Sequence, residues 1–106
     1  MLPKDIIEKE IAAKLKAKPE KAVAVNAVVE LEITGTNGGT WTIDCTKPGG
    51  EVKAGSSGSA KLTVTMADTD FSDMFDGKLN PQAAFLGGKV KVKGDIGLAL
   101  KLGNIM

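Results

Sequence analysis

Short stretches of alternating apolar and polar residues constrain the fold of this chain more than any other feature of its sequence. Successive side chains of a strand point to opposite faces of a sheet, so each stretch predicts a strand with one buried and one solvated face. Glycine-containing clusters at Thr36–Gly39 and Pro48–Gly50 predict tight turns between the first stretches. The pattern recurs at residues 28–33, 40–45, 51–54 (where it is weakest), 61–66 and 89–93. It predicts a five-stranded, mostly antiparallel sheet with one face open to water.

Helical periods predict the elements that cover the other face of this sheet. Ile7, Ile11 and Leu15 recur at i, i+4 and i+8, which predicts an amphipathic helix over residues 2–18 that ends before a proline. A short basic connection would then lead to the first strand. The chain is therefore expected to form one α+β domain over residues 1–106, with helices packed on one face of the sheet.

The last third of the chain carries three further helix signals. Asp68 can cap a short helix, and Asn80 followed by a proline is typical of the start of a second one. After the fifth strand, Asp95 can cap a final segment over residues 96–106. This segment is apolar on nearly every side, so it is expected to be buried in the core or to meet a ligand or partner.

An apolar stripe on the first of these short helices leaves two interpretations open. Phe71, Met74 and Phe75 recur at i, i+3 and i+4, which is the pattern of an ordinary core. Met adapts to irregular apolar shapes, and short helices cover a sheet less completely than long ones, which favours an internal space for a lipid. The same choice, between core and the lining of an apolar space, applies to the final segment.

The composition excludes several classes of function. The chain has no His, so it holds no imidazole base and no Cys-His or Ser-His pair, and with Cys45 as its single cysteine a structural zinc site is not expected. Its 14 positive side chains are all Lys and face 13 acidic ones, which argues against nucleic-acid binding. Cys45 alternates inward and is expected to be an inert buried thiol. We therefore expect no catalytic residue, no metal, no cofactor and no enzymatic activity.

Three blocks of the sequence resemble the sterol carrier protein 2 family. They are MADTDF at residues 66–71, GKLNPQAAF at 77–85 and GKVKVKGDIGLALKL at 88–102. The blocks follow the family pattern in order and spacing, and the likeness extends more loosely through the first helix and the strand that holds Trp41. A collinear match of this length is more specific than any single short motif.

The resemblance implies an apolar tunnel between the sheet and the helices that holds a fatty acid, a fatty acyl-CoA or a sterol. It also implies that members act as non-enzymatic lipid carriers, or as modules attached to enzymes of fatty-acid oxidation. Because the chain has no Arg, a carboxylate head group would meet Lys or backbone N–H groups, and Lys18 and Lys21 are the candidates. The expected lining residues are Trp41, Ile43, Phe71, Met74, Phe75, Leu79, Gln82, Phe85, Leu86, Ile96, Leu98, Leu100, Leu102, Ile105 and Met106.

We accordingly expect an intracellular lipid carrier that is not an enzyme. The alternatives are an accessory module that presents acyl substrates to an enzyme of fatty-acid oxidation, and a structural module that forms a homodimer through its apolar terminal helix. The lysine row at 89, 91 and 93 adds a transient contact with a membrane surface as an expected interaction. The chain ends at Met106 without the small-Lys-Leu signal of peroxisomal import, so we expect a cytoplasmic rather than a peroxisomal location.

Overall fold

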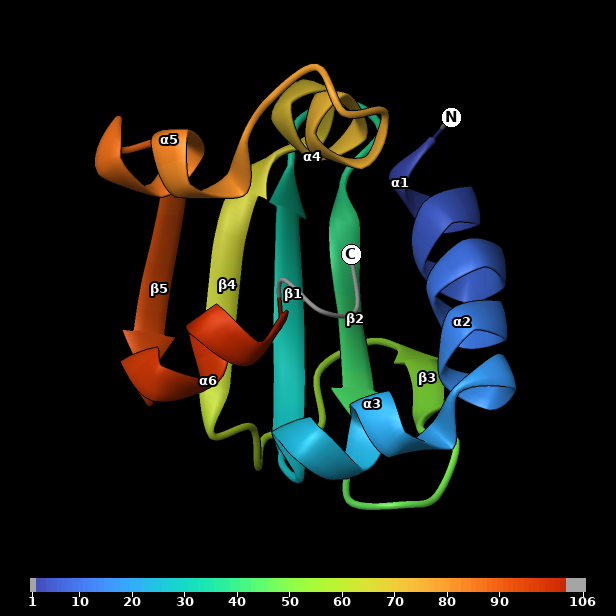
Figure 1. Cartoon of the computed structure of the whole chain (residues 1–106). Coiled ribbons are helices and arrows are strands. Elements are labelled where there is room, and N and C mark those ends of the chain that lie inside the picture. The colour runs from blue at the N-terminus through green and yellow to red at the C-terminus, as the bar shows by residue number, and fades with distance from the viewer. Residues whose placement is uncertain (1, 103–106) are drawn as a thin grey trace.

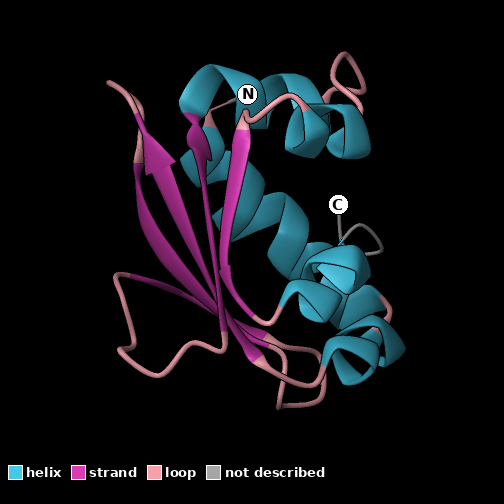
Figure 2. Cartoon of the chain, turned by 90° about the vertical axis from the view of Figure 1, so that its left-hand side faces the viewer, coloured by secondary structure: helices cyan, strands magenta, loops and turns pink. Residues whose placement is uncertain are grey.

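The computed structural model describes residues 2–102, apart from the side chains at 99, 100 and 102 (Figure 1). Along this range the elements are α1 (Pro3–Asp5), the π-helix η1 (Ile6–Ile11), α2 (Ala12–Ala17), α3 (Pro19–Val25), β1 (Val28–Thr34), β2 (Gly39–Asp44), β3 (Glu51–Ala54), β4 (Leu62–Ala67), α4 (Asp68–Phe75), α5 (Pro81–Leu86), β5 (Val90–Gly94) and α6 (Ile96–Leu102). The helices lie on one face of the sheet, as Figure 2 shows from the side. The predicted α+β architecture is confirmed.

The five strands form one mixed sheet in the order β3-β2-β1-β4-β5. β1 pairs antiparallel with β2 and parallel with β4, while β2–β3 and β4–β5 are antiparallel. The register brings Leu31 opposite both Trp41 and Val64, so the apolar residues of neighbouring strands share the helix-covered face. The predicted alternation therefore sets which face is buried, and the prediction of a mostly antiparallel sheet is confirmed.

The first three helical segments run on as one helix on the β2–β3 side of the sheet (Figure 1). The predicted repeat is confirmed, since Ile7, Ile11 and Leu15 are fully buried. Ile6 is fully buried as well, although it lies off the i, i+4, i+8 pattern. The π-helical segment η1 explains this, because its i→i+5 spacing brings Ile6 and Ile11 onto the same face.

A short basic connection to the first strand was expected, but a further helix, α3, occupies most of this stretch. Pro19 ends α2 as predicted, but it is also the first residue of α3, a position where its missing N–H and fixed φ fit a helix. Ala22 and Val25 of α3 are buried. Asn26 then ends the helix in a left-handed conformation with φ of 47°, and β1 begins two residues later.

Two of the three predicted caps are formed as expected. Asn80 Oδ1 accepts hydrogen bonds from the backbone N–H of Gln82 at 2.8 Å and of Ala83 at 3.2 Å. Asp95 Oδ1 accepts one from Gly97 N–H at 3.0 Å. Asp68 is different, because Ala67 occupies the N-cap position of α4 and makes no side-chain cap bond. Asp68 Oδ2 instead accepts from Asn37 N–H at 3.0 Å, which ties the β1–β2 turn to the start of α4.

The face of the sheet opposite the helices is less open than predicted. The loop over residues 55–59 folds back on this face, where Ser56 Oγ donates to the Glu30 carboxylate and Thr42 Oγ1 donates to the Gly55 carbonyl at 2.7 Å. Glu30 and Thr42 are consequently buried, at 7% and 6% exposure. The sequence pattern placed both residues on a solvated face, and the loop that covers them corrects this. Over the described residues, no helix has the length and hydrophobicity to span a bilayer.

Candidate functional site

The helices over β4 and β5 lie in two separate groups. α4 follows the end of β4 and α5 precedes β5, so both lie at the end of the sheet where Met66 pairs with Val90. α6 follows β5 and contacts β4, β5 and α3, which places it at the opposite end, where Leu62 pairs with Gly94. The middle of these two strands, where Val64 pairs with Val92, lies between the groups.

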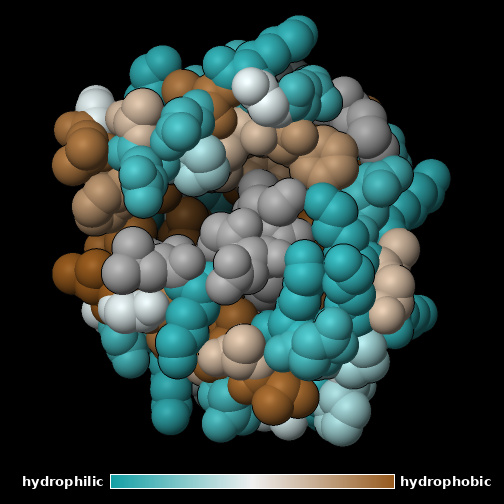
Figure 3. All heavy atoms as spheres, viewed as in Figure 1, coloured by the Kyte–Doolittle hydropathy of each residue, from teal (hydrophilic) through white to brown (hydrophobic). Residues whose placement is uncertain are grey.

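A depression occupies this part of the helix-bearing face. Figure 3 shows it between the surface formed by α4 and α5 and the surface formed by α6, with hydrophobic residues at its depth. We call it the apolar hollow; it lies over the middle of β4 and β5, where Val64 pairs with Val92, and Leu31 and Trp41 continue this middle row of the sheet across β1 and β2.

The exposure of individual side chains agrees with this assignment. In the middle row Trp41 and Leu31 are 5% exposed and Val64 is 7% exposed, and Val92 is half-buried. In the neighbouring row Val29 and Leu62 are completely buried. In the row toward α4 and α5, Ile33 is 5% and Met66 is 3% exposed, and Val90 is half-buried like Val92. The helix cover is therefore least complete over β5 and the adjoining Val64.

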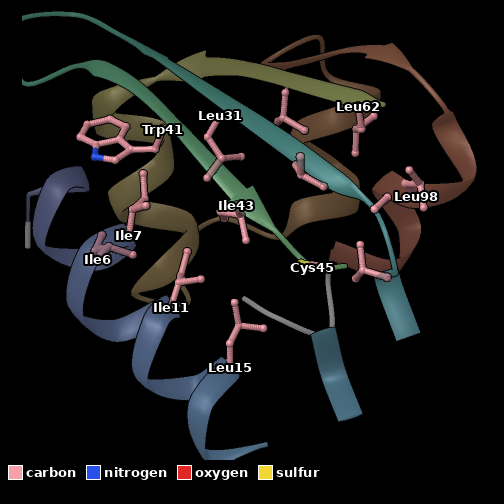
Figure 4. Packing of buried hydrophobic residues seen from close by; sticks show 14 of the residues in the cluster. Ile6, Ile7, Ile11, Leu15, Leu31, Trp41, Ile43, Cys45, Leu62 and Leu98 are labelled. Atoms are coloured by element: carbon pink, nitrogen blue, oxygen red, sulfur yellow. The ribbon is translucent and has the colours of Figure 1, made fainter. Parts of the chain in front are cut away.

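The apolar walls come from α4 and α6. Phe71 is buried in the core, while Met74 and Phe75 are half-buried and pack against the core cluster. Leu98 of α6 is buried at the other end, and Figure 4 shows it across the sheet from Trp41 and the isoleucines of the first helix. Every one of these side chains lacks a charge, so the interior can bind a ligand only by excluding water and by shape.

Two polar contacts connect the first helix to this region, and the sequence analysis missed both. Trp41 Nε1–H donates to Glu8 Oε2 at 2.9 Å, which satisfies the one polar atom of a buried indole. The Lys14 ammonium lies over the ring of Phe75, 5.1 Å from its centroid. Each contact joins residues far apart in sequence, so no local pattern could have predicted them. Lys14, which lies in α2, is thus a third lysine of this helical region beside Lys18 and Lys21.

Cys45 is not a reactive group in this arrangement. Its side chain is buried, and loss of solvation together with the nearby negative charge of Asp44 raises the pKa of the thiol to about 11. A thiol with this pKa stays protonated at neutral pH and is a poor nucleophile. The prediction of an inert buried thiol is confirmed. Among residues 2–102, no three His, Cys, Asp or Glu side chains lie close enough to hold a metal ion.

The predicted lining residues occupy three kinds of environment. Trp41, Ile43, Phe71 and Leu98 are buried, and Met74, Phe75 and Leu79 are half-buried. Gln82, Phe85, Leu86 and Ile96 are exposed. Leu100 and Leu102 lie in α6 with side chains outside the described part, and Ile105 and Met106 lie beyond it. The assignment of all these residues to a ligand stays a prediction.

The two predicted head-group residues lie at the junction of α2 and α3. Lys18 is exposed between these helices, and Lys21 is half-buried in α3. α3 contacts α6, so this junction lies near the end of the sheet that α6 covers. A head-group contact through Lys18 or Lys21 stays a prediction.

Comparison with known proteins identifies relatives of this chain in both sequence and fold. A sequence model described as the SCP-2 sterol transfer family matches residues 8–106. Human sterol carrier protein 2 is 38% identical over 105 residues, which are 95% of this chain and 19% of that protein. Mouse hydroxysteroid dehydrogenase-like protein 2 is 46% identical over 84 residues, which are 78% of this chain and 17% of that protein. The chain thus spans less than a fifth of these two relatives.

A solved structure shares the whole architecture. The solution structure of palmitated SCP2L2 from Aedes aegypti aligns with a TM-score of 0.83 and 30% sequence identity, and the alignment covers 99% of this chain and 94% of that one. The arrangement of sheet and helices described above is therefore one that occurs in a palmitated protein.

Proposed function

Because this chain belongs to the SCP-2 sterol transfer family, whose members bind or transfer lipids, we propose that it carries one fatty-acid chain in the apolar hollow and catalyses no reaction. Fatty acyl-CoA and sterols are the further ligand classes of the proposal. The observation that carries it is the incomplete helix cover over Val64 and Val92, in a fold that a palmitated relative shares.

The driving force of binding is burial of the acyl chain. Each buried CH₂ group contributes ~0.8 kcal/mol, which is about fourfold in affinity. The walls are uncharged, so affinity rises with chain length until the hollow is full and then levels off. The head group contributes less selectivity, since the chain has no Arg to hold a carboxylate in a bidentate fork, and Lys14, Lys18 and Lys21 act as point charges.

Isothermal titration with octanoate, laurate, palmitate and stearate tests this proposal. We expect a dissociation constant that falls steeply from octanoate to palmitate. Val92→Phe, which fills the middle row, should weaken palmitate binding by roughly tenfold or more, because a ring occupies the space of several methylene groups. Val28→Phe on the opposite face of β1 is the matched control and should bind as the wild type does. A flat chain-length series, or equal binding by the two variants, contradicts the proposal.

One observation favours a second function, the presentation of acyl substrates to an enzyme. Hydroxysteroid dehydrogenase-like protein 2 carries the matched segment as 17% of its length, so a domain of this kind occurs within a longer dehydrogenase-like chain. A presenter must hold the acyl chain while the thioester stays outside. We therefore expect palmitoyl-CoA and palmitate to bind with affinities within about tenfold of each other. A strong preference for the free acid contradicts this second function and leaves the carrier function in place.

A further inference from the structure

The turn between β1 and β2 contains an asparagine that is followed directly by a glycine. Asn37 is exposed at the tip of this turn, and Gly38 is the next residue. Asparagine is among the chemically labile residues of proteins. Its side-chain amide can be attacked by the backbone nitrogen of the next residue, and a glycine hinders this attack least because it has no Cβ. The proposed function gives this pair of residues no role.

The fold itself requires the glycine. A Cβ added at position 38 would overlap the carbonyl oxygen of Ile33, which is backbone and cannot move aside as a side chain could. The turn therefore cannot protect Asn37 by placing a bulkier residue after it.

The other asparagines at residues 2–102 lack this combination. Asn26 is followed by Ala27, which is buried and carries a Cβ. Asn80 is followed by Pro81, whose nitrogen has no hydrogen, and its side-chain oxygen is held by two backbone N–H groups at the start of α5. Both residues serve as internal controls for any reaction at Asn37.

Backbone hydrogen bonds of the same turn hold it against α4. Asn37 N–H donates to Asp68 Oδ2 at 3.0 Å, and Gly38 N–H donates to the Gly35 carbonyl at 3.1 Å. A Cβ added at Gly35 would lie 2.5 Å from Asp68 Oδ1, so the backbone of the turn packs directly on this carboxylate. We call these contacts the turn–α4 tie.

We propose that Asn37 deamidates spontaneously to aspartate and isoaspartate and that this modification breaks the turn–α4 tie. The Gly38 nitrogen attacks Cγ of Asn37, its proton and the side-chain NH₂ group leave as ammonia, and a five-membered succinimide closes. Water then opens the ring. Cleavage of the bond from nitrogen to the side-chain carbonyl gives aspartate, and cleavage of the bond to the main-chain carbonyl gives isoaspartate. Water is the only co-reactant.

The reaction proceeds while the turn is locally open, because the closed turn holds the Gly38 nitrogen against the Gly35 carbonyl. Both products then oppose closure. Aspartate places a second carboxylate beside Asp68, to which the backbone of the same residue is bonded. Isoaspartate adds a methylene group to the backbone and so displaces both N–H donors of the turn. The inference does not rest on the proposed function, since it needs only the turn and α4.

Peptide mapping by mass spectrometry tests the site. The folded wild type is incubated at neutral pH and physiological temperature, and samples are digested at intervals. We expect a growing deamidated fraction at Asn37, with isoaspartate exceeding aspartate, and none at Asn26 or Asn80. Asn37→Gln keeps the backbone contacts but must close a larger ring, so it should stay unmodified. Deamidation at Asn37 that is no faster than at Asn26 overturns the proposal.

Urea unfolding tests the effect on the tie. Relative to Asn37→Gln, the purified isoaspartate form should raise the equilibrium constant of unfolding by about tenfold, because it loses a hydrogen bond to a charged group. Asn37→Asp should raise it by about two- to fivefold through like-charge repulsion.

A double-mutant cycle assigns this repulsion to Asp68. In an Asp68→Asn background, where residue 68 is neutral but can still accept the hydrogen bond, Asn37→Asp should change the unfolding constant by less than about twofold. An equal effect of Asn37→Asp in both backgrounds overturns the claim that deamidation acts on the turn–α4 tie. So does an isoaspartate form that unfolds at the same urea concentration as Asn37→Gln.

Discussion

The sheet is covered differently at its two sides. On the β2–β3 side lies the continuous helix α1–η1–α2, whose Ile6, Ile7, Ile11 and Leu15 are completely buried (Figure 4). Over β4 and β5 lie the separate helices α4, α5 and α6, and Val90 and Val92 beneath them are only half-buried. We call these the packed side and the open side.

Helix length explains the difference. A helix that runs the length of the strands brings an apolar residue to the sheet at every turn, so its contacts form without a gap. α5 has six residues and α6 has seven, and glycines at 87 and 88 end α5 before it can extend along the strands. Each of these helices covers one end of the strands and leaves the middle of β4 and β5 less covered. The packed side therefore holds the most completely buried helix residues, and the open side holds the candidate site.

The largest expected effect on stability comes from truncating an isoleucine on the packed side, compared with the same change on the open side. Ile11→Ala on the packed side should lower the free energy of unfolding by about 2–5 kcal/mol, because it leaves a cavity in a closely packed cluster. Ile96→Ala on the open side should change it by less than about 0.5 kcal/mol, since this side chain is 60% exposed. Urea unfolding of the two variants measures the difference. Equal losses would remove the distinction between the sides.

Glycine substitutions make a second matched pair. Gly50 and Gly88 both have positive φ, of 67° and 77°, so alanine at either position is strained by about 1 kcal/mol. At Gly50 an added Cβ would also lie 2.8 Å from Cδ1 of the buried Leu15, whereas at Gly88 no atom lies within 4 Å. Gly50→Ala should therefore be the more destabilising by a further ~1–3 kcal/mol. The same unfolding assay tests this, and a smaller loss at Gly50 would show that the packed side tolerates extra volume.

The pKa of the Cys45 thiol shows whether water reaches the interior beside β2. In the unfolded chain it ionises near the ordinary thiol pKa of 9.0, whereas burial raises the pKa to about 11 in the folded protein. Between these pH values the unfolded state binds fewer protons, so the stability contributed by the protonated thiol is full below pH 9 and falls as the pH rises to 11. The loss is on the order of 2 kcal/mol.

Cys45→Ala isolates this contribution, because the other titrating groups stay the same. We expect the unfolding free energy of the wild type to fall more steeply than that of the variant across this alkaline range. Parallel curves would mean that the thiol ionises normally and that water reaches it in the folded protein.

The smallest expected effect on stability concerns the hydrogen bond between Glu8 of the first helix and Trp41 of β2. Glu8→Ala removes the acceptor for Trp41 Nε1–H and should lower stability by about 1 kcal/mol. It should also change the emission of Trp41, the only tryptophan in the chain. Lys9→Ala on the same exposed turn is the control and should alter neither the emission nor, beyond about 0.5 kcal/mol, the stability. An unchanged emission spectrum in Glu8→Ala would contradict the contact.

Local elements were largely predictable from the sequence. Alternation identified all five strands, including the weak β3, and the i, i+4 repeat identified the first helix. Asn80 and the adjoining Pro81 marked the start of α5 through a cap that the structure contains. Each of these signals depends on residues within one or two turns of each other, where backbone geometry alone sets the relation between side chains.

The failures of prediction share a different cause. The helix α3 was missed because Pro19 ends one helix and begins the next. The burial of Glu30 depends on Ser56, which is 26 residues away in sequence, and the contact between Glu8 and Trp41 spans 33 residues. Neither partner has a local signature.

The sequence by itself determined the family, the strands, and which face of the sheet is apolar, because residue periodicity decides which side chains share a face. Only the tertiary structure decided where that face stays incompletely covered and which exposed residues surround the gap. The packed and open sides have the same alternating pattern in their strands. They differ in the length and placement of the helices above them, which arise from packing among segments that are distant in the chain.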